Sequence, residues 1–382
     1  MKNIAVIFGG QSAEHEVSII TAHIPIIQSL EALGQFKVFP VYISKKGEWY
    51  CEEKFKEMSF FQEPDFEQQL LKFKKVNLSL NNHFKIIWPG ITQKSENIDI
   101  VFPAMHGTNG EDGSLMGLLR FANVPFVGCD MASSAIAMDK AVTKQVLSAQ
   151  NISVVPYVWF VKSQWEKNRE KILDDIKKLN WPMFVKPVHL GSSIGISKVK
   201  NEQELLNAVE VALHYDNKVL VEESIEDLIE VTLPIIGNEN PELGSVERPL
   251  NKTEFFDFKD KYLSAGKGQG VNAQYSQIPA EISQELSEKV KELGLQSYKG
   301  IGCSGIARID FLINSKTGMV YVNEINTLPG SLYHHNWRKS GVSSVDLVKK
   351  LVVFAEQRFE EQKTLSFNFN SDILKKFKGA KG

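Results

Sequence analysis

Short apolar runs that alternate with stretches of helical periodicity constrain the fold of this chain more than any other feature of its sequence. Residues 4–8 form an apolar run that ends in two glycines, and helical periodicity follows over residues 17–33. Further apolar runs occupy residues 38–43 and 98–103. Strands and helices that alternate in this way predict an α/β domain built on a parallel sheet, which we expect to span residues 1–128.

The remainder of the 382-residue chain is long enough for further domains at about 150 residues each. We expect a second unit of strands and helices over residues 129–222, a third over 223–357, and a tail at 358–382. Residues from about 248 to 280 are polar and irregular, and such long segments in compact domains are usually functional lids or disordered segments. Of these, we expect a mobile lid within the third unit. Residues 45–97 are also polar and irregular, and they suggest no chemistry.

Charge and cysteine content exclude several classes of protein. The 44 Lys and Arg residues against 46 Asp and Glu leave no excess positive charge for a nucleic acid or an anionic membrane. The three cysteines are too few for a disulfide framework, and no C-x-x-C pair suggests zinc or redox chemistry. The first apolar run is too short for a signal peptide, and no run reaches the about 18 residues of a membrane helix. We expect a cytoplasmic protein that binds neither nucleic acid nor membranes.

Polar side chains share one face of a predicted β-hairpin over residues 306–325. The alternation of a strand places Arg308 and Asp310 on one face of the first strand, and Glu324 and Asn326 share a face across the turn. Pairing of the two strands would bring Asp310 close to Glu324. Oxygen donors of this kind suit magnesium, although a solvated face with an Arg–carboxylate pair explains the same pattern equally well.

Four further residues are candidates, and each has a plain structural alternative. Lys186 comes before the small-residue loop KPVHLGSSIG, whose backbone amides suit a phosphate; without the P-loop order, the alternative is a surface lysine beside a turn. Lys140 could be an exposed helix lysine. His106 could contact a ligand at the carboxyl edge of the sheet or be a structural histidine. Glu14 could simply complement a helix dipole.

Taken together, these segments resemble the D-alanine–D-alanine ligases of the ATP-grasp superfamily, from about residue 2 to about residue 357. The motifs that carry the resemblance, in order, are FGGQSAEHEVS (8–18), HGTNGEDG (106–113), MDK (138–140), KPVHLGSSIG (186–195), KY (261–262), GIARID (305–310) and NEINTLPG (323–330). The resemblance implies an α/β (α+β) fold with a three-domain ATP-grasp architecture and an N-terminal parallel-sheet domain. It also implies ATP-dependent ligation of two D-alanines through an acyl phosphate, for peptidoglycan synthesis.

The resemblance assigns ATP to the space between the central and C-terminal domains. Lys140 and Lys186 match the two lysines that hold its phosphates. Glu222 matches the acidic residue at the adenine. Glu230 matches the one at the ribose, although the loop between the two looks one residue longer here.

A larger set of residues matches the groups that surround the reacting atoms in the family. The family's magnesium (or manganese) ligands match Asp310, Glu324 and Asn326, and the groups that hold the developing oxyanion match Arg308 and the amide of Gly330. In the substrate pocket, Glu14 matches the anchor of the first substrate's ammonium, hydrogen-bonded through Ser192 to Tyr262, while Lys261 matches a contact to the second carboxylate and His106 a substrate contact. The lid would close over this pocket and exclude water.

One segment departs from the commonest family pattern. Where many relatives have a Thr/Ser-rich run that helps to hold the second carboxylate, residues 331–337 read SLYHHNW, so that anchor is left unassigned. A relative that uses D-lactate or D-serine as its second substrate is the nearest alternative. A nucleotide-binding protein without ligase activity is another, and a dinucleotide-dependent dehydrogenase is disfavoured because G-x-G-x-x-G is missing. The family resemblance also suggests a homodimer formed through the N-terminal domain.

Overall fold

The N-terminal part of the protein is built on a sheet in which the central strand β1 pairs in parallel with both of its neighbours. The computed structural model describes residues 1–81, 83–91, 94–250 and 276–377. The sheet has the order β3-β2-β1-β7, with β1 (Lys2–Gly9), β2 (Phe36–Ile43), β3 (Trp49–Cys51) and β7 (Ile100–Pro103). Only β3 is antiparallel to its partner. The predicted parallel sheet is confirmed.

The helical stretch expected after the first strand forms, but it is not one regular helix. It consists of α1 (His15–Thr21), the π-helical segment η1 (Ala22–Ile27) and α2 (Gln28–Leu33). Pro25 lies inside η1. Because proline has no backbone N–H and its ring clashes with the preceding turn, it disturbs regular α-helical bonding.

The prediction that residues 45–97 are irregular was wrong. Besides β3 they form η2 (Glu53–Lys56), α3 (Met58–Gln62), α4 (Phe66–Leu70) and an antiparallel sheet of β4 (Asn77–Ser79), β5 (Phe84–Trp88) and β6 (Lys94–Ile98). Aromatic packing holds the helical part. The ring of Phe55 lies 5.1 Å from that of Phe60, and the ring of Phe61 lies 5.0 Å from that of Tyr42 on β2.

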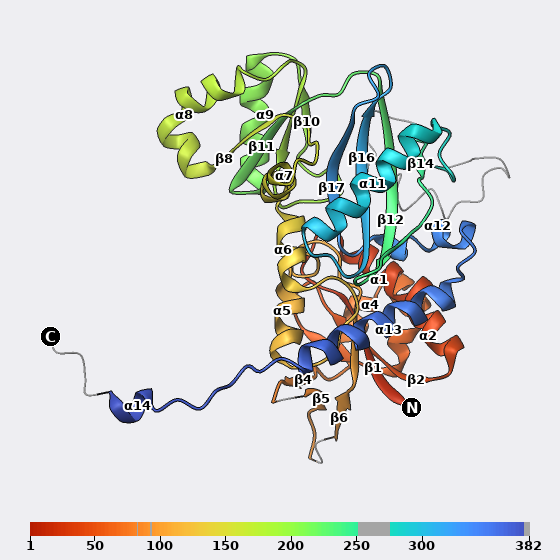
Figure 1. The fold of residues 1–382 in the computed structure, drawn as a ribbon. Helices are drawn as coiled ribbons and strands as arrows, with labels where there is room; N and C mark the ends of the chain where they lie inside the picture. The colour runs from red at the N-terminus through yellow and green to blue at the C-terminus, as the bar shows by residue number, and fades with distance from the viewer. Residues whose placement is uncertain (82, 92–93, 251–275, 378–382) are drawn as a thin grey trace.

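The central part is an antiparallel sheet of order β10-β9-β11-β8 with helices packed beside it (Figure 1). Its elements are β8 (Tyr157–Val161), α8 (Lys162–Ile176), β9 (Met183–Pro187), β10 (Ser197–Val199), α9 (Glu202–Tyr215) and β11 (Lys218–Glu223). The helices α5 (Ser114–Phe121), α6 (Met131–Met138) and α7 (Lys140–Ala149) lead into it. The helical region over residues 131–149 is therefore divided into two helices. Asp139 separates them and caps α7, since its carboxylate accepts from Val142 N at 2.9 Å.

The C-terminal part holds a second antiparallel sheet, of order β13-β12-β16-β17. Its strands are β12 (Leu228–Gly237), β13 (Glu242–Leu243), β16 (Gly305–Asn314) and β17 (Val320–Asn326). The other elements are β14 (Arg248–Pro249), β15 (Ser276–Gln277), α11 (Gln284–Gly300), η3 (Gly330–Tyr333), α12 (His334–Lys339), α13 (Ser344–Lys363) and α14 (Ile373–Lys376). The predicted hairpin of β16 and β17 is confirmed.

The C-terminal helix α13 packs against the N-terminal part of the chain. It packs against α2 and η1 of the N-terminal part, and its apolar face shares one core cluster with strands β1 and β2 (Figure 1). It continues to Lys363, past residue 358 at which we expected the tail to begin. The described residues beyond it, which end at residue 377 and include α14, extend away from the body (Figure 1). Within the described part of the chain, none of the helices has both the length and the apolar character needed to cross a membrane.

Candidate functional site

A β-bulge in the hairpin aligns the predicted oxygen donors. Phe311 pairs with Val322, but the register then shifts by one residue, so that Asp310 pairs with Glu324 instead of Asn323. A bulge of this kind re-aims the side chains that follow it. The prediction that Asp310 lies close to Glu324 is confirmed. On the same face, the amide nitrogen of Asn326 donates to Asp310 Oδ2 at 3.2 Å.

Arg308 forms an ion pair with the carboxylate of Asp310. Its Nε and Nη2 donate to the two oxygens of Asp310 at 2.6 Å each, a bidentate geometry that is among the strongest side-chain pairs. The guanidinium also lies over the ring of Tyr333, 5.2 Å from its centroid. The Arg–carboxylate pair and the cluster of oxygen donors, which the sequence left as alternatives, therefore occur together on one face.

Lys140 brings the central part of the chain to this hairpin. It is the first residue of α7, and its Nζ donates to the carbonyl of Leu190 at 2.8 Å. The same Nζ lies 3.9 Å from Glu324 Oε2. A cation from the central part thus faces the acidic face of the C-terminal sheet. This is the arrangement that a polyphosphate bridging the two parts would need.

Lys186 and Glu222 form a buried ion pair on neighbouring strands. Phe184 of β9 is paired with Glu222 of β11, so Lys186 is the diagonal neighbour of Glu222 on the same face, and its Nζ donates to Glu222 Oε1. On the other side, Lys144 Nζ lies 2.9 Å from Glu222 Oε2. Burial acts to raise the pKa of Glu222, but the two lysine charges outweigh it and lower that pKa to about 2.

Lys144 is the functional-site residue that our reading of the sequence missed. It lies one helical turn after Lys140 on α7, so the two side chains share a face of that helix. That spacing is the signal in the sequence that could have pointed to it. Burial lowers the pKa of Lys144, as expected for a lysine whose side chain is only 2% exposed.

Glu14 and Ser192 join the N-terminal part to the loop after β9. Ser192 Oγ donates to Glu14 Oε1, as the resemblance implies. Ser192 adopts φ 55°, a left-handed conformation that is uncommon for a non-glycine residue and points to a local constraint. At Gly191 an added Cβ would lie 3.2 Å from Glu14 Oε2, so a side chain there would crowd the carboxylate.

His106 is buried and hydrogen-bonded within the protein. Its Nε2 lies 2.8 Å from Thr21 Oγ1, and Thr21 Oγ1 also accepts from the backbone N–H of Ser331 at 2.9 Å. The histidine is therefore linked through Thr21 to the segment that follows Gly330. His106 therefore supports that segment through Thr21, which is the behaviour of a structural histidine. The sequence had left this alternative open.

The segment after Gly330 has an unusual backbone. Ser331, Leu332 and Tyr333 have φ values of 48°, 53° and 52°, so three consecutive non-glycine residues are left-handed. Strain of this kind persists only where the surrounding structure imposes it, and it is frequent at functional sites. Here Tyr333 is fixed by a hydrogen bond between its hydroxyl and Thr232 Oγ1 at 3.0 Å. The departure from the family pattern is thus a defined turn beside Arg308.

Three predicted residues remain to be placed. Glu230 is an exposed residue of β12. Lys261 and Tyr262 lie outside the described residues, as does most of the predicted lid. The two ends of the lid are nevertheless adjacent, because β14 and β15 pair as a short antiparallel ribbon, with Arg248 opposite Gln277.

The donors on the hairpin fit a hard divalent cation. Two carboxylates and one amide face the same side of β16 and β17, and oxygen donors of this kind are what magnesium prefers. In the part of the chain that the structure describes, no group of three or more His, Cys, Asp and Glu side chains could hold a metal. The predicted set differs from such a group because Asn326 supplies its third oxygen.

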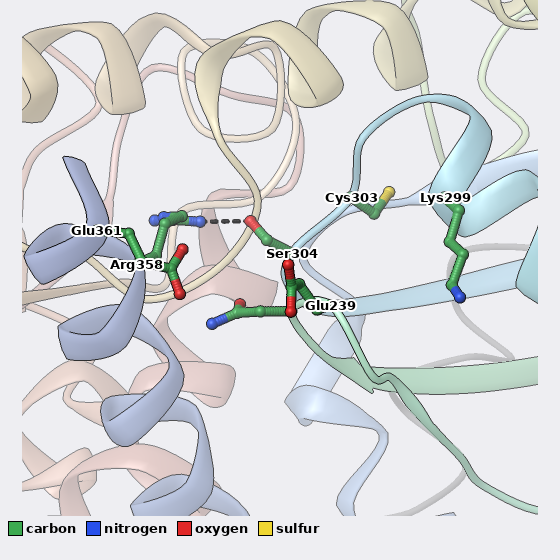
Figure 2. A pocket seen from close by; sticks show the side chains of 7 residues that line it. Glu239, Lys299, Cys303, Ser304, Arg358 and Glu361 are labelled. Carbon is green, nitrogen blue, oxygen red and sulfur yellow. Dashed lines mark hydrogen bonds between the residues drawn. The ribbon is translucent and has the colours of Figure 1, made fainter. Parts of the chain in front are cut away.

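A cavity of about 400 Å³ lies at a different place, between α13 and the segment before β16 (Figure 2). Its lining side chains include Cys303, Ser304 and Arg358. Arg358 donates to Ser304 Oγ and to the backbone carbonyls of Phe126 and Gly128. None of the predicted site residues lines this cavity, and the contacts of Arg358 are those of a junction between parts of the chain.

The sequence matches proteins of known activity over almost its whole length. Two family models match, described as the N-terminus of D-ala D-ala ligase over residues 3–129 and its C-terminus over residues 146–353. The D-alanine–D-alanine ligase of Thermosipho melanesiensis is 39% identical over 376 residues, covering 98% of this chain and 99% of that protein. The corresponding ligase of Acetivibrio thermocellus is 36% identical over 377 residues, covering 94% of this chain and 97% of that protein.

Solved structures give the same result. The D-alanine-D-alanine ligase from Coxiella burnetii matches with a TM-score of 0.77 at 29% identity, over 95% of this chain and 98% of that one. The VanG D-Ala:D-Ser ligase from Enterococcus faecalis matches with a TM-score of 0.75 at 34% identity, over 93% of this chain and 99% of that one.

Proposed function

The chain belongs to the D-alanine–D-alanine ligase family, and we propose that the polar cluster of the hairpin, α7 and β9 is its active site. The enzyme is an ATP-dependent ligase that joins two D-alanines into D-alanyl-D-alanine for peptidoglycan synthesis. Its architecture is the three-domain ATP-grasp fold. The observation that carries the site assignment is the approach of Lys140 to Glu324, 3.9 Å apart, because it joins two parts of the chain around one charged space.

ATP is proposed to lie between the central sheet β10-β9-β11-β8 and the C-terminal sheet β13-β12-β16-β17. Lys140 and Lys186 are proposed to hold the phosphates, since each is a partly exposed cation of the central part. Lys140 faces Glu324 of the hairpin, and Lys186 lies near the end of β9 beside the small-residue loop. Glu222 is placed at the adenine end and Glu230 at the ribose. In this structure Lys186 is engaged by Glu222, so ATP binding requires an exchange of partners at Lys186.

The metal site is proposed at Asp310, Glu324 and Asn326. These residues would hold magnesium or manganese, and an ion bound there would supply positive charge that neutralises the phosphates during phosphoryl transfer. Asp310 also holds Arg308 through two hydrogen bonds of 2.6 Å. The carboxylate therefore fixes the direction of the guanidinium as well as serving the cation.

The reaction proceeds in two steps. The carboxylate of one D-alanine takes the γ-phosphoryl group of ATP, which gives an acyl phosphate and ADP. The amine of the second D-alanine then attacks the acyl carbon, and phosphate leaves. Arg308 and the Gly330 amide are proposed to stabilise the developing oxyanion, a contribution of about 3 to 4 kcal/mol per donor in comparable sites.

The first D-alanine is proposed to bind at the junction of the N-terminal part and the loop after β9. Glu14 is only 9% exposed and accepts from Ser192, so its carboxylate is held in place to pair with the substrate ammonium. Tyr262 is proposed to extend this chain of hydrogen bonds, and Lys261 to contact the second carboxylate. His106 is proposed to act on the substrate only through the segment that it supports.

The second substrate, which accepts the activated D-alanine, could differ from D-alanine, and this gives a second candidate function. The VanG structure, titled a D-Ala:D-Ser ligase, matches over 93% of this chain at 34% identity. Residues 331–337 also depart from the commonest family pattern at the place where the second carboxylate is held. D-serine or D-lactate as the second substrate is therefore the alternative to a second D-alanine.

The location and assembly of the enzyme are also proposed. All three cysteines are free thiols, which supports a reducing, cytoplasmic location. A homodimer through the N-terminal part rests on the family resemblance, and sedimentation of the purified enzyme at assay concentration tests it.

The experiment that tests the function measures ADP release from ATP and magnesium with no acceptor, with D-alanine alone, and with D-alanine plus D-serine or D-lactate. The products are then identified by mass spectrometry. Release that requires D-alanine, with the dipeptide as product even when the competing acceptors are present, supports the proposal. A dominant mixed product would favour the alternative, and release that is independent of D-alanine would contradict both.

A further inference from the structure

One buried carboxylate is shared by two lysines that differ in their access to solvent. The side chain of Glu222 is 1% exposed, that of Lys144 2%, and that of Lys186 11%. Lys186 lies near the end of β9, next to the loop that we assign to phosphate. Lys144 is a buried residue of α7. Only Lys186 is positioned to exchange its partner when a ligand arrives.

When Lys186 exchanges Glu222 for a phosphate, the buried charge of Glu222 becomes less well neutralised. When Lys186 moves to a phosphate, Glu222 loses one of its two cations while remaining out of water. An ionised carboxylate in that environment is strongly unfavourable without a counter-ion. Lys144 stays within ion-pair distance, 2.9 Å from Glu222 Oε2, and it has no comparable exposure through which to leave.

We propose that Lys144 is the permanent counter-ion of Glu222 and thereby releases Lys186 to the phosphates of ATP. Lys144 touches neither substrate nor reacting atoms in this account, so it is a positioning residue. The inference rests on the proposed nucleotide site and deepens it, because it explains why one carboxylate is flanked by two lysines.

The groups around Glu222 define what a variant will do. They are Lys144 of α7, Lys186 of β9, and Tyr157 of β8, which is the strand partner of Glu222. The charge of Lys140, one turn before Lys144 on α7, acts on Lys144. With Lys144 removed, Glu222 has Lys186 as its near counter-ion. ATP must then either forgo that lysine or bind together with a proton that neutralises Glu222.

Proton uptake gives the role a signature that packing alone does not have. We expect Lys144→Met to raise the dissociation constant of ATP with magnesium at least tenfold at pH 8, measured by calorimetry. The loss should shrink at pH 6, because protons are more available there, and binding should release heat that depends on the ionisation enthalpy of the buffer. Lys144→Arg, which keeps the charge, should bind ATP within about threefold of the native enzyme.

A double variant isolates the carboxylate. Glu222→Gln removes the charge that Lys144 compensates, so adding Lys144→Met to it should change ATP affinity by less than threefold and abolish the pH dependence. This comparison remains valid if Lys144→Met alone does not fold. The control is Lys56→Met, which removes a partly exposed lysine (16%) of the N-terminal part that pairs with Glu53 and, at 3.5 Å, with Glu31. It should leave ATP affinity unchanged.

Three results separate the outcomes. If Lys186→Ala does not weaken ATP binding, the nucleotide site itself is misassigned. If Lys186→Ala weakens binding but Lys144→Met stays within twofold at both pH values, the counter-ion role is wrong and the site stands. A double variant that binds ATP more than threefold more weakly than Glu222→Gln also overturns the role, because Lys144 would then act by a route other than Glu222.

Discussion

Glu324→Gln separates a metal ligand from a member of a surface ion pair. The substitution keeps the size of the side chain and removes one negative charge. In the structure, Glu324 Oε2 lies 3.9 Å from Lys140 Nζ, with side-chain exposures of 27% and 12%. A pair this long and partly solvated contributes at most about 1 kcal/mol, so the free energy of unfolding should fall by no more than that. Loss of charge stabilisation at the transferring phosphoryl group costs about 3 to 4 kcal/mol, which is a fall of about 10² to 10³ in kcat.

The assay compares initial rates of ADP release over a magnesium titration with unfolding in urea. The matched control is Glu242→Gln on β13 of the same sheet, whose carboxylate pairs with Lys350 at 2.7 Å and is 47% exposed. This control should change neither rate nor stability appreciably. Near-native turnover of Glu324→Gln at limiting magnesium would refute the metal assignment. A rate loss that merely tracks a loss of stability would point to a structural role.

Three further predictions follow from other parts of the site. Lys186→Ala should raise the KM for ATP and lower kcat, because a phosphate loses its cation; unchanged kinetics would leave Lys186 with only a structural role as the partner of Glu222. Tyr262→Phe should raise the ratio of D-lactate to D-alanine product in a competition assay, and an unchanged ratio would remove Tyr262 as a selector. Hydrogen bonds that the His189 ring donates to the carboxylates of Asp139 and then Asp216 raise the pKa of His189 to about 9, so His189 stabilises the fold fully below about pH 6.5 and loses that effect as the pH rises through 9. Because the ring is 41% exposed, His189→Gln should cost only about 1 kcal/mol of unfolding free energy at pH 6 and nothing at pH 10; equal losses at both would exclude the charge.

Features that depend on local spacing could be predicted from the sequence. Alternating apolar runs predicted the parallel sheet, which the structure confirms. Asn201 and Glu204 have the spacing of a capping box, and the Asn201 side chain accepts from Glu204 N at 3.0 Å. The two polar faces of the hairpin followed from strand alternation. The bulge at Asp310 could not be predicted in this way. An extra residue between β16 and β17 depends on how β16 also pairs with β12 on its other side.

Features that depend on distant contacts could not be predicted. The phenylalanines of residues 45–97 follow neither helical nor strand period, and their burial against Tyr42 and one another is visible only in the fold. Lys144 looks like any helix lysine until Glu222 is placed beside it. The break at Asp139 arises where capping competes with continued helical periodicity.

The left-handed turn of residues 331–333 is the clearest case of a tertiary constraint overriding local preference. None of its residues is glycine, yet each adopts a positive φ. The turn is held from outside, by Thr21 at the N–H of Ser331 and by Thr232 at the hydroxyl of Tyr333. Its partners lie in other parts of the chain, so the SLYHHNW string alone carries no signal for it.

Transfer of oxygen from D-alanine to phosphate shows whether D-alanine is activated as an acyl phosphate. The enzyme is incubated with ATP, magnesium and D-alanine labelled with ¹⁸O in its carboxylate, and the released phosphate is analysed by mass spectrometry. Because the phosphoryl group leaves with one oxygen of the attacked carboxylate, we expect one ¹⁸O atom in the phosphate for each dipeptide formed. Dipeptide formation with unlabelled phosphate, or with AMP and pyrophosphate as products, would contradict it.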